Sequence, residues 1–191
     1  MIKNLLYGFL ILTAFSSCVD NEIAVPKPRG FMRTDFPEKS YITFTSDCPY
    51  SFDIPTYAQV EDVPADSLNH CYKNVRFTPF KGTLHLTYKD LKNDVGNYID
   101  ECHQLAYDHA IKATAINRKQ FINDTTKVYG LIYDIQGNAA SPLQFYVTDS
   151  VKHFIRGALY FEAKPNYDSI RPVLEYVRED VIRFIESTQW K

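Results

Sequence analysis

The chain contains LQFYVTDSVKHFIRGALYF at residues 143–161. In this stretch two runs rich in aromatic and β-branched residues, 143–148 and 152–161, flank Asp149 and Ser150. Such residues favour half-buried sheet surfaces, whereas Asp and Ser favour turns. The stretch therefore predicts an antiparallel β-hairpin.

Alternation of apolar and polar residues extends upstream of this hairpin. Within residues 83–88, Leu84, Leu86 and Tyr88 alternate with hydroxyl-bearing or imidazole side chains, which indicates a strand with one buried face. Similar runs predict further strands at residues 40–45, 72–77, 116–122 and 128–135.

Two segments have the three-to-four-residue apolar spacing of an amphipathic helix, residues 94–112 and 169–188. Asp168 is the predicted N-cap of the second helix, with Pro172 in its first turn. Several strands and two long helices predict an α+β fold, an antiparallel β-sheet with two main helices packed on it.

The composition is that of a globular protein. The 191 residues are 45% hydrophobic and 23% charged, enough for one domain with a core. The formal net charge is −2 and no large basic patch is present, which argues against nucleic acid as a partner.

The first 17 residues, MIKNLLYGFLILTAFSS, are typical of an export signal. One cation precedes an apolar run that is shorter than the roughly 20 residues needed to span a bilayer. Because Cys18 follows directly, we expect a lipoprotein signal peptide at 1–17, lipidation of Cys18 and membrane attachment through that lipid. The alternative is an ordinary secreted protein.

Residues 18–29 are polar, contain two prolines and are expected to form a lipidated tether to a single globular domain at 30–191.

Three further cysteines would meet an oxidising compartment after export. A disulfide between Cys48 and Cys71 is favoured because both lie in extended, turn-rich sequence. Cys102 lies on the apolar stripe of a predicted helix, so we expect a buried free thiol there. A metal site is the alternative use of these cysteines, but no CxxC or HxxxH spacing supports it.

No pattern of catalytic or cofactor-binding residues is present. The chain lacks a GxSxG nucleophile elbow and phosphate-loop glycine spacing, so no catalytic, cofactor or metal-binding residue is assigned. One modification is expected. Asp66, Ser67 and Leu68 match the Asp-Ser-aliphatic pattern at which Bacteroidetes attach O-glycans, which makes Ser67 a candidate glycosylation site.

Ordered blocks along the whole chain resemble the gliding-motility lipoprotein GldD family of Bacteroidetes. They are the signal, PKPRGFMRTDFPEKSY (26–41), CPYSFDIPTY (48–57), FTPFKGTLHLTYK (77–89), residues 128–161, PNYDSIRPVLEYVREDV (165–181) and ESTQWK (186–191). The resemblance implies a cell-envelope lipoprotein, facing the periplasm or the cell surface, that supports gliding and type IX secretion. It implies no enzymatic activity and no cofactor. The order of strands and the final helix is also similar to the PsbP/Mog1 arrangement, whose domains act mostly as binding modules.

The leading hypothesis is therefore a non-catalytic interaction module whose partners are other envelope lipoproteins or components of gliding and type IX secretion. Arg156 and Tyr160 on the last strand are candidate docking residues. The structural alternatives are that Arg156 holds a loop and that Tyr160 packs under a helix. A binding module for a small envelope ligand, a glycan or lipid fragment in an aromatic groove, is the second hypothesis, and an enzyme is the third.

Overall fold

The computed structural model describes residues 34–63, 71–163 and 166–191. Residues 1–17 and 18–29, the predicted signal and tether, lie outside this part. The described helices are α2 (Val95–Tyr107) and α3 (Tyr167–Ser187), with 3₁₀ turns at Thr78–Phe80 and Asp108–Ile111. The described strands are β1 (Tyr41–Thr45), β2 (Tyr50–Pro55), β3 (Ala58–Asp62), β4 (Lys73–Phe77), β5 (Gly82–Asp90), β6 (Ala113–Asn123), β7 (Val128–Gly137), β8 (Leu143–Thr148), β9 (His153–Phe161) and β10 (Gln189–Trp190).

Seven of these strands form one antiparallel sheet in the order β3-β4-β5-β9-β8-β7-β6. The hairpin predicted from residues 143–161 is β8–β9, with Leu143 opposite Leu159 and Thr148 opposite Phe154. It lies inside the sheet, between β5 and β7. Together with the two helices, this arrangement confirms the predicted α+β class.

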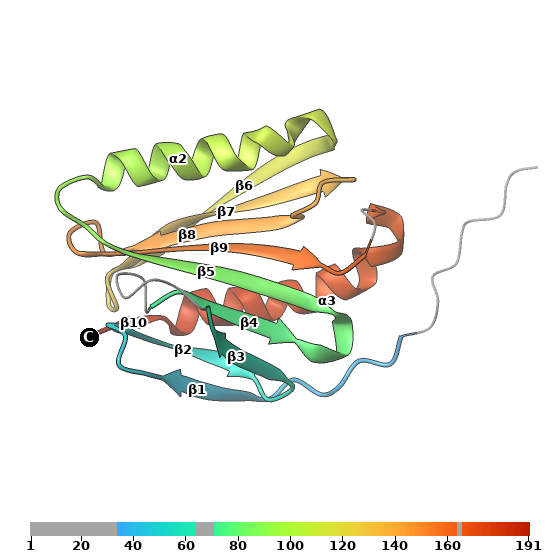
Figure 1. Ribbon diagram of the computed structural model, residues 1–191, viewed down its shortest axis with the longest axis horizontal. Helices are drawn as coiled ribbons and strands as arrows, with labels where there is room; N and C mark the ends of the chain where they lie inside the picture. The colour runs from blue at the N-terminus through green and yellow to red at the C-terminus, as the bar shows by residue number, and fades with distance from the viewer. Residues whose placement is uncertain (1–33, 64–70, 164–165) are drawn as a thin grey trace, which may run out of the picture. The chain divides into compact units, whose positions relative to one another are not determined.

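The two helices lie on opposite faces of this sheet (Figure 1). On the α3 side, the core is formed by the sheet, the helix and β2. Phe145 of β8 and Phe52 of β2 both pack against Phe184 of α3, with ring centroids 5.5 and 4.2 Å apart. The strand β2 belongs to a second sheet, β1-β2-β10, which the sequence analysis did not predict.

Helix α3 forms because its apolar residues recur on one face. Leu174, Val177, Val181, Phe184 and Ile185 are all buried, and burying each such side chain contributes about 2 kcal/mol. The helix begins two residues earlier than predicted, at Tyr167 rather than at residue 169.

This earlier start corrects two predictions about the beginning of α3. Asn166 is the N-cap residue. Asp168 lies in the first turn, where its negative charge interacts favourably with the positive end of the helix dipole. Pro172 consequently lies inside the helix rather than in its first turn.

Helix α2 is shorter than the predicted segment 94–112. It ends at Tyr107 and continues as the 3₁₀ turn Asp108–Ile111. The helix buries Cys102 and Ala106, whereas Ile111 is 94% exposed. The apolar stripe therefore ends where the sheet no longer lies beneath it.

Candidate interaction surface

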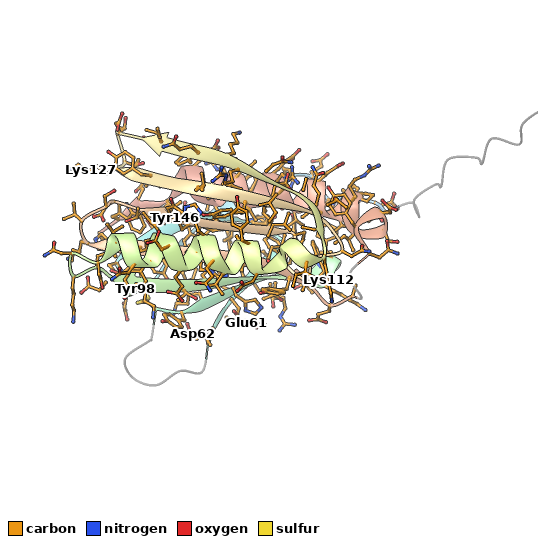
Figure 2. The ribbon with its side chains drawn as sticks, turned by 90° about the horizontal axis from the view of Figure 1, so that it is seen from above. Glu61, Asp62, Tyr98, Lys112, Lys127 and Tyr146 are labelled. Carbon is orange, nitrogen blue, oxygen red and sulfur yellow. A yellow bond between two sulfur atoms is a disulfide. The ribbon has the colours of Figure 1, made fainter. Side chains whose placement is uncertain are left out.

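One face of the seven-stranded sheet is only partly covered. Helix α2 packs over this face, with Phe154 of β9 and Cys102 in one apolar cluster that Tyr146 of β8 borders. Figure 2 shows α2 crossing the sheet near Tyr146, with Glu61 of β3 on one flank. On that flank the side chains of β3, β4, β5 and β9 that share this face are, apart from the buried Ala158, mostly polar and exposed or half-buried. We call them the polar face: Gln59, Glu61, Asn74, Arg76, Thr83, His85, Thr87, Arg156 and Tyr160.

Arg156 lies where the polar face meets the helix. Its Nη2 donates to Oε1 of Gln144 on the neighbouring strand at 2.9 Å. Gln144 is only 2% exposed, and its Nε2 has no hydrogen-bond acceptor among the described residues. Arg156 thus bonds a buried amide of the neighbouring strand and does not hold a loop, which was its structural alternative.

Tyr160 lies beside His85 on the adjacent strand. The two rings meet edge to face with centroids 5.4 Å apart, and Nδ1 of His85 is 2.7 Å from Oδ1 of Asn74. Burial lowers the pKa of His85, which keeps its imidazole neutral at neutral pH. Tyr160 therefore packs within a row of cross-strand contacts and not beneath a helix.

The outer part of the polar face ends in ion pairs. Nε of Arg76 is 3.1 Å from Glu61, and its Nη1 is 3.6 Å from Glu162. Among the described residues, no group of three His, Cys, Asp or Glu side chains is placed to hold a metal ion. A row of polar side chains, several of them held by cross-strand contacts, is suited to recognising another polar surface, since arginine and tyrosine are enriched in protein interfaces.

A second cluster surrounds a buried carboxylate on α3, and sequence reasoning missed it. Asp180 is 1% exposed. Its Oδ1 accepts from Nζ of Lys39 at 2.6 Å and from the Tyr41 hydroxyl at 3.0 Å, and its Oδ2 accepts from the Tyr57 hydroxyl. Lys39 also donates to the backbone carbonyl of Tyr176 at 2.6 Å. We call Lys39, Tyr41, Tyr57, Tyr176 and Asp180 the carboxylate clamp.

The clamp fastens the segment that precedes β1 to the last helix. Burial, and then the hydrogen bond to Asp180, raise the pKa values of Tyr41 and Tyr57 far above the ordinary tyrosine value, so both remain donors. The sequence held one signal for this site. Asp180 falls on the apolar stripe of α3 between Val177 and Val181, where a charged residue needs a buried partner.

A sequence model of the family described as "Gliding motility lipoprotein GldD" matches residues 21–190. The chain belongs to this family. The match covers both the polar face and the carboxylate clamp, so both lie within the family's domain. Family membership places the protein in the cell envelope as a lipoprotein associated with gliding motility. No curated protein matches the chain by sequence.

Among solved structures, the fold of this GldD-family chain is similar to cyanobacterial PsbP (CyanoP) from Synechocystis sp. PCC 6803. The TM-score is 0.51 and the sequence identity 14%, over 84% of this chain and 98% of the other. At this identity the likeness shows the fold alone, and it confirms the PsbP-like arrangement expected from the order of strands and final helix.

The cysteines of this family member fall into three settings. A disulfide joins Cys48, just before β2, to Cys71, just before β4, with Cα atoms 5.5 Å apart. Cys102 is a free, buried thiol whose pKa burial raises to about 12, which makes it unreactive at neutral pH. Cys18, the predicted lipidation site, lies outside the described residues, as does the glycosylation candidate Ser67. No helix in the described ranges is long and apolar enough to cross a membrane.

Proposed function

We propose that this chain is a lipid-anchored, non-catalytic assembly factor of the cell envelope. In this proposal Cys18 carries the lipid, and the domain holds other envelope lipoproteins or components of gliding and type IX secretion on the periplasmic or outer side. Family membership supports the envelope location and the link to gliding. The polar face carries the docking role.

One observation supports docking of a protein more than binding of a small molecule. Arg156 and Tyr160 are half-buried on a polar sheet face beside α2, and both are held by cross-strand contacts before any partner arrives. Preorganised side chains lose little conformational entropy on binding. A glycan or lipid fragment would instead require an aromatic groove. The pocket of about 110 Å³ next to α3 is lined by aliphatic, charged and amide side chains, with no aromatic one. A larger pocket of about 420 Å³ has Phe44 as the one aromatic residue in its described lining, among mostly polar side chains.

Cross-linking in intact cells of the native host tests this proposal, using a tagged full-length chain and mass-spectrometric identification of the captured proteins. We expect the chain to capture gliding or type IX secretion components. The double variant Arg156→Ala/Tyr160→Ala should lose at least about 90% of that capture, because ΔΔG values of 2 kcal/mol or more are typical of interface hot spots. Cys18→Ala, which removes the lipid, should also lose it.

The matched control is Arg171→Ala/Tyr107→Ala, which removes the same residue types from positions outside the polar face. Tyr107 is 44% exposed and Arg171 lies on the exposed side of α3. Unchanged capture by the Arg156 and Tyr160 variant would reject the polar face as the docking surface. Correct anchoring with no reproducible protein partner would favour the ligand-binding alternative.

A further inference from the structure

The strand β6 is a long, free sheet edge. It has 11 residues, Ala113–Asn123, about twice the common strand length. It pairs only with β7, and in the described ranges no strand lies on its other side. Such an edge presents unpaired N–H and C=O groups, which are a template for one more strand.

A small pocket opens where β6 passes α3. Its apolar part comes from Ile132 of β7, Leu143 of β8 and Val181 of α3, and its polar part includes Asn117 and Lys119 of β6. The volume is about 110 Å³. A cavity of about 150 Å³ holds one benzene molecule. The pocket therefore fits a single aliphatic side chain and is too small for a lipid acyl chain.

The edge and the pocket are positively charged. Two cations, Arg118 and Lys119, and no carboxylate lie within β6, although the whole chain has a net charge of −2. At the pocket, Nη2 of Arg178 donates to Asp134 at 2.6 Å, but its buried Nε has no acceptor among the described residues. A carboxylate at the mouth of this pocket would be attracted to Lys119 and Arg178, and one on the α2 side of the same edge to Arg118, which lies opposite Tyr133.

This charge also disfavours a second copy of the chain as the occupant. Arg118 is the central residue of β6. Antiparallel pairing of two copies about that centre would place Arg118 directly opposite Arg118 of the other copy, with Lys119 opposite Asn117 on either side. Like charges directly opposite on paired strands are destabilising.

We propose that β6 and this pocket form a docking groove for an extended acidic segment of a partner protein. The segment adds to β6 as an eighth strand of the large sheet. Its carboxylates face Arg118 and Lys119, and the next residue on the α3 side places one aliphatic side chain in the pocket beside Asn117. Since Asn117, Arg118 and Lys119 are consecutive, the segment has the pattern Glu-Glu-aliphatic when it runs antiparallel to β6, and the reverse when parallel.

The groove is separate from the polar face, because it lies at the β6 edge, whereas the polar face spans β3, β4, β5 and β9. Figure 2 labels Lys112 and Lys127 near opposite ends of β6, where they lie outside the pocket. These two exposed lysines provide a matched control for charge on the same hairpin.

Peptide binding to the oxidised mature chain tests the groove by fluorescence anisotropy. The probes are fluorescein-labelled Thr-Val-Glu-Glu-Xaa-Thr-Val peptides with Xaa as Ala, Val, Leu, Ile or Phe, their reversed sequences, and forms with Lys-Lys for Glu-Glu. We expect the acidic Leu or Ile peptide to bind most tightly and the Lys-Lys forms not to bind. Arg118→Glu/Lys119→Glu should weaken binding at least about tenfold, and Lys112→Glu/Lys127→Glu less than about threefold.

Two further readouts locate the peptide. Hydrogen exchange should slow at the backbone amides of β6 when the peptide binds, with no change in β3 at the other edge. Ile182→Phe, which places a larger side chain at the pocket wall, should remove the preference for Leu over Ala. Circular dichroism of each variant establishes that it is folded.

Several outcomes would overturn the groove and leave the polar-face proposal intact. The first is that every acidic peptide binds with a Kd above about 1 mM. The second is that the two charge-reversal pairs weaken binding equally, and the third is that hydrogen exchange slows outside β6 instead of within it. Sedimentation showing that the chain forms dimers through β6, lost in Arg118→Glu/Lys119→Glu, would also reject it. In that case the basic residues of β6 would not exclude a second copy.

Discussion

The carboxylate clamp is the most consequential polar contact at the scale of single residues. Asp180 is fully buried, and Lys39 is its only cationic partner at hydrogen-bond distance among the described residues, with a side chain 22% exposed. A buried carboxylate that loses its cation keeps the desolvation cost without the compensating attraction. Removing either Lys39 or Asp180 alone is therefore expected to lower the free energy of unfolding more than replacing both together with apolar residues.

We expect Lys39→Met to destabilise the fold by about 3 kcal/mol, measured by urea unfolding. The double variant Lys39→Met/Asp180→Leu should be less destabilised than the two single changes added together, because no charge remains buried. Lys112→Met, a change at an exposed lysine, is the control and should alter stability by less than about 0.5 kcal/mol. Strict additivity of the two changes would show that Lys39 and Asp180 are not coupled.

His153 predicts a dependence of stability on pH. It is 4% exposed, its Nδ1 is 2.8 Å from the Tyr88 hydroxyl, and its ring stacks on Trp190 at 5.2 Å. Burial lowers its pKa, partly opposed by Asp149 and Asp90. The folded state therefore holds the neutral imidazole, whereas the unfolded chain takes up a proton near its ordinary pKa of about 6.5.

Stability from this group is complete above about pH 6.5 and is lost as pH falls toward the lower folded-state pKa. In His153→Gln, we expect the free energy of unfolding to decline less between pH 7.5 and 5.5 than in the original chain. Urea titrations at several pH values in this range measure the difference. The same slope in both proteins would mean that His153 is not the group responsible.

At the scale of elements, the close pairing of β8 and β9 depends on a glycine. A Cβ atom at Gly157 would lie 2.3 Å from Cε1 and Cζ of Phe145 on the neighbouring strand. We expect Gly157→Ala to destabilise the protein by about 2 kcal/mol, measured by urea unfolding, because the Phe145 ring must move within a packed core. In a Phe145→Leu background this penalty should shrink.

Gly96 in α2 is the matched control, since a Cβ there meets nothing within 4 Å. Gly96→Ala should stabilise the protein by roughly 0.5 to 1 kcal/mol through helix propensity. Equal destabilisation by Gly157→Ala with and without the Phe145 ring would show that the ring is not the obstacle.

The elements that sequence predicted correctly are those with long, regular apolar patterns. β8 coincides with the predicted 143–148, and the ends of β5, β7 and β9 lie within two residues of the predicted bounds. Three short strands, β2, β3 and β10, were missed, although the equally short β1 and β4 were predicted. In β2, Tyr50, Phe52 and Ile54 alternate and are buried, but flanking prolines and the nearby Cys48 made the segment look turn-rich.

Other features depend on contacts that no local pattern contains. The two residues of β10 are a strand only because Ser51 and Tyr50 lie opposite them. Arg156 and Tyr160 were found by alternation along a single strand. Their neighbours Gln144 and His85 could not be found in this way, because they lie on other strands and only the pairing register places them beside β9. The carboxylate clamp joins residues 141 positions apart. In the sequence, the one visible sign of it was the charged Asp180 on the apolar stripe of the last helix.

At the scale of the whole molecule, the disulfide ties the segment before β2 to the segment before β4. Cys48 and Cys71 are 23 residues apart. Closing a loop of this length stabilises a fold by about 3 kcal/mol through the unfolded chain. We therefore expect dithiothreitol to lower the urea midpoint of unfolding of the original chain and to leave that of Cys48→Ala/Cys71→Ala unchanged.

Peptide mapping under non-reducing conditions is the direct check of this bond. It should recover Cys48 and Cys71 in one linked fragment and Cys102 as an alkylated free thiol after denaturation. Linkage of Cys102 to either of the other two would contradict the arrangement described here.

The position of β2 between β1 and β10 has a consequence for the order of folding. The β1–β2 hairpin pairs within the first described residues, but it is completed only by α3 and β10, because Lys39 bonds Asp180 and β2 pairs with Gln189 and Trp190. Such long-range closure folds slowly. The N-terminal part of the domain therefore stays incomplete until α3 and β10 are available, which makes the last helix the element whose arrival completes the fold.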